Sequence, residues 1–148
     1  MKIVISKDQI LLGLQAVQNI VGSRTTLPIL SNVLLRTREN KLELTATDLD
    51  VTIACAVNAE VKAAGEVTIP VKKLYGIVRE LTATEIELEV DDRNACQLHA
   101  GASEYKINGL GAEEFPALPV FKEENSVTIK QEKIKAMLRR TSYAVSSD

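Results

Sequence analysis

The order of apolar and polar residues repeats one short pattern three times along the chain. The pattern begins at residues 3–5, 67–69 and 127–129, where two apolar residues flank one other residue. After four mostly polar residues, each start is followed by two apolar residues four positions apart: Ile10 and Leu14, Leu74 and Val78, Ile134 and Leu138. Alternation is typical of a half-buried strand, and a spacing of four is typical of an amphipathic helix. We therefore predict three strand–helix units that begin about 60 residues apart, as an internal repeat.

Three further strands are expected after the first helix. The apolar periodicity predicts a strand over residues 2–6 and a helix over 7–21, and then strands over 32–37, 41–46 and 51–57. Residues 58–65 are small and polar and are interpreted as a linker. The first unit, about residues 1–60, is therefore expected to have the order β-α-β-β-β.

The second unit, about residues 66–124, repeats this order. A strand over 66–69 ends at Pro70, a helix is predicted over 71–81, and alternating residues predict strands over 85–90, 94–100 and 104–108. A third unit begins at Ser126 but contains a strand and a helix alone. We interpret the chain as part of a longer repeating protein; the alternative is a terminal helix that docks on its own.

Composition places the chain among soluble globular proteins. It has 148 residues, of which 45% are hydrophobic and 26% charged. The sequence has no apolar run of membrane-spanning length, and its start is too short and too soon polar for a secretory signal. Cys55 and Cys96 stand in no metal-ligand spacing, which favours a reduced, cytoplasmic setting. No membrane partner is expected.

The sequence contains no set of residues that supports catalysis. Asp48 and Asp50 have the spacing of a metal-binding pair, but aspartates are common in turns for their own backbone hydrogen bonds. His99 has no Cys or carboxylate partner nearby in sequence and is interpreted as a surface residue. There is no glycine-rich phosphate loop. We expect a non-enzymatic protein without a cofactor or a metal site.

Charge is distributed unevenly although the formal net charge is only −2. Residues 72–81 contain Lys72, Lys73 and Arg79 against one acid, and residues 131–143 contain four cations against one. Residues 85–92 contain five acids and no cation. The second and third predicted helices are therefore basic, and such asymmetry creates a directional field at a near-neutral total charge.

Five segments of the chain carry a resemblance to a known family: the start MKIVI, the loop RTTLPIL at 24–30, the turn TATDLD at 45–50, the junction IPVKK at 69–73 and EFP at 114–116. They resemble the bacterial sliding clamp, the beta subunit of the replicative DNA polymerase, and the resemblance spans residues 1–148. It implies an α+β DNA-clamp fold of β-α-β-β-β units, with helices on the inner wall of a ring and antiparallel sheets outside. Residues 1–125 would be the first clamp domain, and 126–148 the truncated opening of the second.

The resemblance also implies a function and its residues. The expected protein is a DNA polymerase processivity factor, a homodimeric head-to-tail ring that encircles duplex DNA without reading its sequence. The expected DNA contacts are Arg24, Lys72, Lys73, Arg79, Lys135 and Arg139. Tyr105 and Ile107 are expected at the dimer interface, on an edge strand. DNA polymerase and an ATP-driven clamp loader would bind through parts outside this chain.

Two other functions remain compatible with the basic helices. The chain could be an open nucleic-acid-binding module that uses the helices as a groove wall, with affinity for short linear duplexes at low salt. It could also be a structural repeat protein that binds through its sheet. A helix face with three cations is most often simply solvated.

Overall fold

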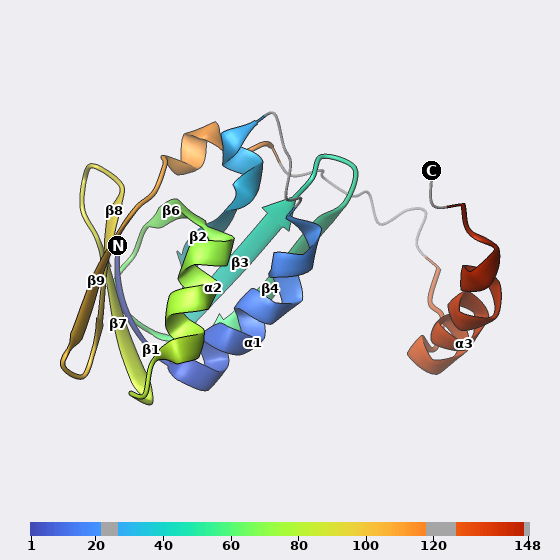
Figure 1. Cartoon of the computed structure of the whole chain (residues 1–148), viewed down its shortest axis with the longest axis horizontal. Helices are drawn as coiled ribbons and strands as arrows, with labels where there is room; N and C mark the ends of the chain where they lie inside the picture. Colours follow the sequence, from blue (N-terminus) through green and yellow to red (C-terminus); the bar gives the residue numbers. More distant parts are fainter. Residues whose placement is uncertain (22–26, 118–126, 147–148) are drawn as a thin grey trace. The chain divides into compact units, whose positions relative to one another are not determined.

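The computed structural model describes residues 1–21, 27–117 and 127–146, which divide between two units (Figure 1). The first unit lies within Met1–Leu118 and the second within Pro119–Asp148. In these described residues, no helix is long and apolar enough to cross a membrane.

Two antiparallel sheets form the first unit. One has the strand order β5-β1-β7-β8-β9 and the other β4-β3-β2-β6. The strands are β1 (Lys2–Ser6), β2 (Asn32–Arg38), β3 (Lys41–Thr47), β4 (Thr52–Asn58), β5 (Glu60–Ala63), β6 (Glu66–Pro70), β7 (Glu85–Val90), β8 (Ala95–Ala100) and β9 (Ser103–Asn108). The predicted α+β class with antiparallel sheets is confirmed.

The two sequence repeats exchange their first strands. Strand β1 pairs with β7 of the second repeat, with Ile3 opposite Leu88. Strand β6 begins the second repeat but pairs with β2 of the first, with Val67 opposite Leu35. Each sheet therefore contains strands from both repeats, so neither sheet can be completed by one repeat alone.

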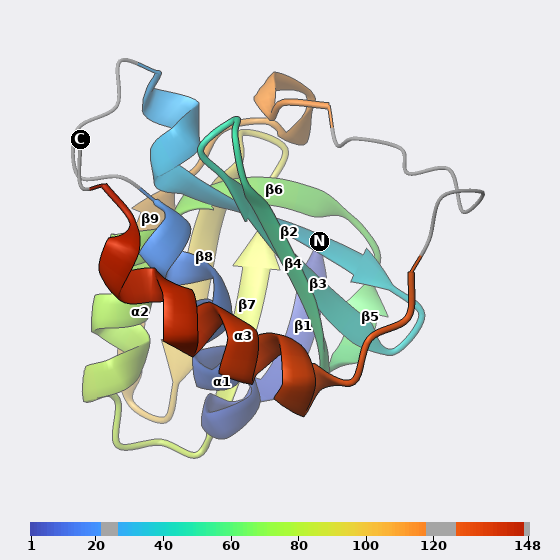
Figure 2. The same ribbon diagram turned by 90° about the vertical axis from the view of Figure 1, so that its right-hand side faces the viewer.

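Two helices pack against the sheets side by side, as Figures 1 and 2 both show. Helix α1 (Lys7–Val17) begins at Ser6, whose Oγ accepts the Gln9 backbone N–H at 3.3 Å. Helix α2 (Val71–Glu80) follows Pro70. The Lys7 Nζ at the start of α1 donates to the carbonyl oxygens of Arg79 and Leu81 at the end of α2. A cation there compensates the negative end of the helix dipole, so Lys7 joins the two helices.

A single hydrophobic core joins both sheets and both helices. The apolar positions that defined the repeat are fully buried within it, including Ile10 and Leu14 of α1 and Leu74 and Val78 of α2. Burying one such side chain contributes about 1.5–3 kcal/mol. Burial of these stripes fixes which face of each helix remains at the surface.

The segment after β9 closes one edge of the four-stranded sheet. Leu110 and Thr68 exchange two backbone hydrogen bonds of 3.0 Å. The buried Thr68 hydroxyl also donates to the Leu110 carbonyl and accepts from Asn32 Nδ2, both at 3.1 Å. A short 3₁₀ turn, η3 (Ala112–Glu114), follows, and Phe115 is buried. This connector is therefore part of the fold of the first unit.

The structure corrects three boundaries predicted from the sequence. The first helix ends at Val17 and tightens into a 3₁₀ turn, η1 (Gln18–Ile20), so it is shorter than the predicted 7–21. The expected linker 58–65 contains the strand β5, which pairs with β1. The apolar pattern does not predict this strand, because Val61 is its only large apolar residue. Residues 127–130 form no strand, because no described residue pairs with them.

The second unit consists of the predicted third helix. Helix α3 (Gln131–Thr141) is followed by the 3₁₀ turn η5 (Ser142–Ala144). Its apolar positions Ile134 and Leu138 are 42% and 62% exposed, whereas the equivalent Leu74 and Val78 of α2 are fully buried. Within the described part of the second unit, Ile134 and Leu138 of α3 therefore have no sheet over them, unlike Leu74 and Val78 of α2 in the first unit.

Substitution of glycine by alanine is expected to have opposite effects on stability at two helical positions. A Cβ at Gly13 would lie 2.7 Å from the buried Leu44 Cδ1, whereas a Cβ at Gly76 would meet nothing within 4 Å. Gly76→Ala should raise the free energy of unfolding by ~1 kcal/mol through helix propensity. Gly13→Ala should lower it by about 1–2 kcal/mol through overpacking. Urea unfolding followed by circular dichroism measures both; equal shifts of one sign would contradict the packing described here.

The two cysteines should differ in reactivity because they differ in burial. Burial raises the pKa of the Cys96 thiol to about 11 and raises that of the half-buried Cys55 as well. Since thiolate is the reactive form, iodoacetamide at mildly alkaline pH should modify Cys55 first and Cys96 only as the chain opens. Mass spectrometry of the alkylated peptides over a urea series measures this order. Equal rates in the native chain would contradict it.

Candidate nucleic-acid interface

Helix α2 separates apolar and cationic residues on opposite faces. Val71, Leu74 and Val78 are fully buried against the sheets. Lys72 and Arg79 are exposed and lie on the opposite side at the spacing of the helix, 3.6 residues per turn. Folding of the stripe therefore places both cations on the outward side of α2.

The three predicted cations of α2 differ in how they are engaged. Among the residues that the structure describes, no ion pair or hydrogen bond engages the side chains of Lys72 and Lys73. Arg79 Nε lies 2.8 Å from Glu80 Oε1, and its guanidinium lies 6.0 Å from the centre of the Tyr75 ring. The hydrogen bond and charge of Glu80 raise the pKa of Arg79. The two lysines are thus freer than Arg79 to meet an anion.

Helix α1 adds little positive charge to this surface. Its exposed residues, Asp8, Leu12, Gln15 and Ala16, include no cation. Lys7 is used to cap the end of α2. In the described part of the first unit, the basic helix surface is therefore that of α2.

Helix α3 carries the cations predicted for the third repeat. Lys135 and Arg139 are exposed, and no ion pair engages them within the described residues. They lie away from the stripe of Ile134 and Leu138, in the pattern of α2. Arg24, the remaining predicted DNA contact, lies outside the described residues.

Strand β9 is an edge of the five-stranded sheet. Tyr105 and Ile107 point to the same face, opposite Leu98 and Cys96 of β8. Tyr105 is 39% exposed, but the Ile107 side chain is fully buried in the core. Tyr105 can therefore offer its ring to a partner, whereas Ile107 can offer only its backbone.

The remaining candidate residues have structural roles. Asp48 Oδ1 accepts the backbone N–H groups of Asp50 and Val51 at 3.1 and 2.7 Å, so it holds a turn, as the turn interpretation predicts. His99 is half-buried on β8, opposite Glu87 of β7. In the described residues, no three His, Cys, Asp or Glu side chains gather as a metal site.

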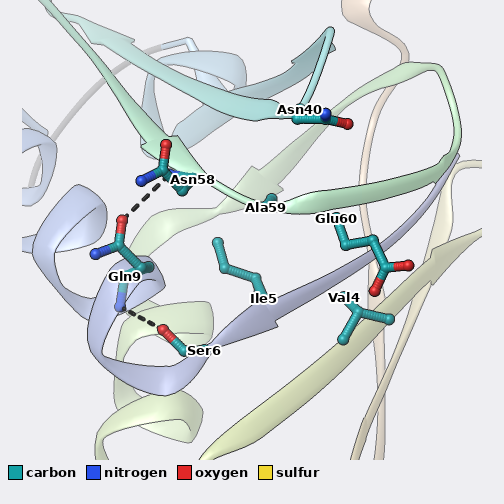
Figure 3. A pocket seen from close by; sticks show the side chains of 8 residues that line it. All are labelled: Val4, Ile5, Ser6, Gln9, Asn40, Asn58, Ala59 and Glu60. Carbon is teal, nitrogen blue, oxygen red and sulfur yellow. Dashed lines mark hydrogen bonds between the residues drawn. The ribbon is translucent and has the colours of Figure 1, made fainter.

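A cavity of about 520 Å³ lies beside the start of α1 (Figure 3). Gln9 crosses its rim, where Oε1 accepts the Asn58 backbone N–H at 3.1 Å. The lining includes the carboxylate of Glu60 and no Lys or Arg: Val4, Ile5, Ser6, Gln9, Asn40, Asn58, Ala59 and Glu60. It is therefore unsuited to phosphate and separate from the basic face of α2.

Two side-chain contacts near the basic surface of α2 were not predicted from the sequence. Glu80 neutralises part of Arg79, and Lys7 is occupied at the end of α2. The adjacency of Glu80 to Arg79 was a visible signal for the first. The second depends on the contact between α1 and α2, which the sequence does not reveal.

Comparison with known proteins gives consistent matches. Residues 1–119 match the family model of the DNA polymerase III beta subunit, N-terminal domain. The beta sliding clamp of Chlamydia muridarum is 36% identical over 148 residues, which are 100% of this chain and 40% of that protein. A Vibrio harveyi beta sliding clamp sequence is 32% identical over 145 residues, 97% of this chain and 100% of that sequence. The chain thus spans about 40% of the length of the first curated relatives that it matches.

Solved structures share the fold. The sliding clamp of Bartonella birtlesii, bound to griselimycin, superposes with a TM-score of 0.94 at 32% identity, covering 100% of this chain and 40% of that one. The DNA polymerase sliding clamp of Bacillus subtilis also gives 0.94, at 28% identity, over 100% and 41%.

Single substitutions should separate the free from the paired cations of α2. Lys72→Gln should weaken binding of a short DNA duplex at low salt about threefold to fivefold, from the ~1 kcal/mol of one exposed charge contact. Glu80→Gln should strengthen binding, because it releases Arg79. Fluorescence anisotropy measures both. Lys106→Gln, on exposed β9, is the charge-matched control, and a loss there equal to that of Lys72→Gln would contradict a local interface.

Proposed function

This chain belongs to the DNA polymerase III beta subunit family, as its N-terminal domain, and from that premise we propose that it forms part of a ring-shaped sliding clamp. The family acts in bacterial DNA replication as a non-enzymatic processivity factor, so the chain is not an enzyme. The proposed protein encircles duplex DNA and tethers the replicative polymerase in the cytoplasm.

The exposed cationic face of α2 is the observation that carries the proposal. Its cations lie opposite a buried stripe, and the two lysines have no partner among the described residues. Lysines on a solvated helix attract phosphates through counterion release, which is independent of sequence and sensitive to salt. They read no base, as suits a protein that must move along DNA.

Other parts of the chain extend the same surface in the proposal. Lys135 and Arg139 of α3 and Arg24 are assigned to further phosphate contacts by family resemblance. Residues 1–125 are assigned to a first clamp domain and residues 126–148 to the opening of a second. Because the chain spans about 40% of its first relatives, the remaining domains and the sites for polymerase and clamp loader would lie in the rest of the protein.

The edge strand β9 is proposed as the contact with the partner subunit. A bare edge can add a strand from another chain through its backbone groups. Tyr105 would contribute its exposed ring, and Ile107 would hold the strand in place from the core. The proposed assembly is a head-to-tail ring of two full-length chains.

Topological binding is tested with the full-length protein that contains this chain. Loaded by its clamp loader onto a nicked circular DNA, the protein should remain on the circle when salt is raised. It should leave when the circle is cut, because the ends then allow it to slide off. Gel filtration of labelled protein with the DNA measures retention.

Two other outcomes would contradict the proposal. Loss of protein with rising salt before any cut would indicate an open, non-topological nucleic-acid-binding module. Failure to associate with the circle, with Lys72→Gln and Arg79→Gln changing nothing, would indicate a structural repeat protein. A nicked circle without loader serves as the control for adventitious charge binding.

A further inference from the structure

The cavity beside the start of α1 lies where the chain passes from one sheet to the other (Figure 3). Strand β4 ends at Asn58 in the four-stranded sheet, and β5 begins at Glu60 in the five-stranded sheet. Between them, the Ala59 backbone N–H donates to the Asn40 carbonyl at 3.1 Å. Gln9 Oε1 of α1 accepts the Asn58 backbone N–H. Hydrogen bonds thus fix three segments around the cavity, so its shape exists before a ligand arrives.

The lining combines buried apolar residues with polar groups that are free to bind. Ile5 and Ala59 are 2% and 8% exposed. The side-chain amides of Asn40 and Asn58 have no hydrogen-bond partner among the residues that the structure describes. The volume of about 520 Å³ lies within the range of about 300–1,000 Å³ that is usual for ligand sites, which combine apolar walls with a few polar groups. The cavity therefore has the size and composition of a binding site.

The charge around the cavity favours a cationic ligand. Across the sheet, Val4 of the lining lies between Glu60 of β5 and Glu87 of β7. The strands β5, β1 and β7 carry four carboxylates and two ammonium groups: Glu60, Glu85, Glu87, Glu89, Lys2 and Lys62. Two negative charges are thus in excess, and a concave surface beside them attracts cations.

Glu60 is the carboxylate of the lining, and its present partner is weakly held. It pairs with Lys62, two residues along the same strand, and the two side chains are 63% and 48% exposed. Exposed ion pairs of this kind contribute little free energy. A better-matched cation can therefore take the place of Lys62 at small cost.

We propose that this cavity binds an arginine side chain presented by a segment of a partner protein. The aliphatic stem of the arginine would lie on Val4 and Ile5, and its guanidinium would donate to Glu60 and to the side-chain oxygens of Asn40 and Asn58. Five N–H donors in a planar fork suit several acceptors around a rim, whereas a lysine ammonium is a compact, strongly hydrated point charge. DNA takes no part in this contact, which goes beyond the proposed function.

Titration of the 148-residue chain with short capped peptides tests the site. The peptide acetyl-Gly-Arg-Gly-amide should shift the backbone amides of Gln9, Asn58 and Ala59 in ¹⁵N NMR spectra. Its affinity should exceed that of the neutral citrulline analogue about tenfold, the scale of one hydrogen bond between charged groups. The lysine analogue should bind about threefold more weakly than the arginine peptide. Ethylguanidinium, which lacks the peptide backbone, should bind more weakly still.

Two variants and a matched control locate the contact. Glu60→Gln should weaken binding of the arginine peptide about fivefold, because it removes the charge of the lining. Asn40→Ala, in an exposed turn, should weaken it about twofold through one lost hydrogen bond. Glu104→Gln removes an exposed carboxylate from β9, at the opposite edge of the same sheet, and should change nothing. Circular dichroism verifies that each variant is folded.

Four outcomes would overturn the proposal. Equal affinity for the arginine peptide and either its citrulline or its lysine analogue would show that the cavity does not select a guanidinium. Equal affinity for ethylguanidinium would exclude a protein segment as the ligand. Equal weakening by Glu60→Gln and Glu104→Gln would indicate general attraction to the negative sheet. Absence of amide shifts at the cavity would exclude the site itself. All four leave DNA binding by α2 untouched, so they do not bear on the proposed function.

Discussion

The exchange of first strands between the two repeats is the constraint on which the first unit depends. Because β1 completes the sheet of β7, β8 and β9, and β6 completes the sheet of β2, β3 and β4, each helix begins directly after a strand that pairs in the sheet of the other repeat. This brings α1 and α2 together over one shared core. Lys7 then joins the two helices by donating to the last carbonyls of α2. The surface of α2 is thus positioned by pairings far from it in sequence.

Packing and charge act on different faces of α2, and this separation explains its suitability for a mobile contact. The buried stripe of Val71, Leu74 and Val78 stabilises α2, so the outward residues of the helix are not needed for packing. The two lysines are solvated point charges on flexible stems, which follow a moving phosphate better than a rigid bidentate fork. Arg79 is held by Glu80 and Tyr75 and contributes a more fixed charge. The surface therefore combines adjustable and fixed cations around a helix backbone left open at Gly76.

Much of this arrangement could be predicted from the sequence, because apolar periodicity reports burial directly. Apolar periodicity predicts both helices of the first unit and its strands other than β5. The spacing of Leu74 and Val78 predicts the outward position of Lys72 and Arg79. The exchange of β1 and β6 could not be predicted. Alternation of apolar and polar residues shows which face of a strand is buried, but it does not show which strands pair with it. Strand β5 was missed because a short polar edge strand needs its partner to form. The engagement of Arg79 and Lys7 depends on side-chain geometry that no pattern of residue types encodes.

The bridge between Leu110 and Thr68 determines how the first unit would respond to a force that pulls on the chain. Tension applied to the chain beyond residue 117 would pass through Phe115 and then through the three hydrogen bonds between Leu110 and Thr68 before it reached a strand of the core. Each such bond contributes about 1 kcal/mol, far less than the buried stripes behind it. The bridge would yield first and uncover the free edge of β6 while the sheets stay intact. Force spectroscopy would register this as a short extension ahead of the main unfolding event.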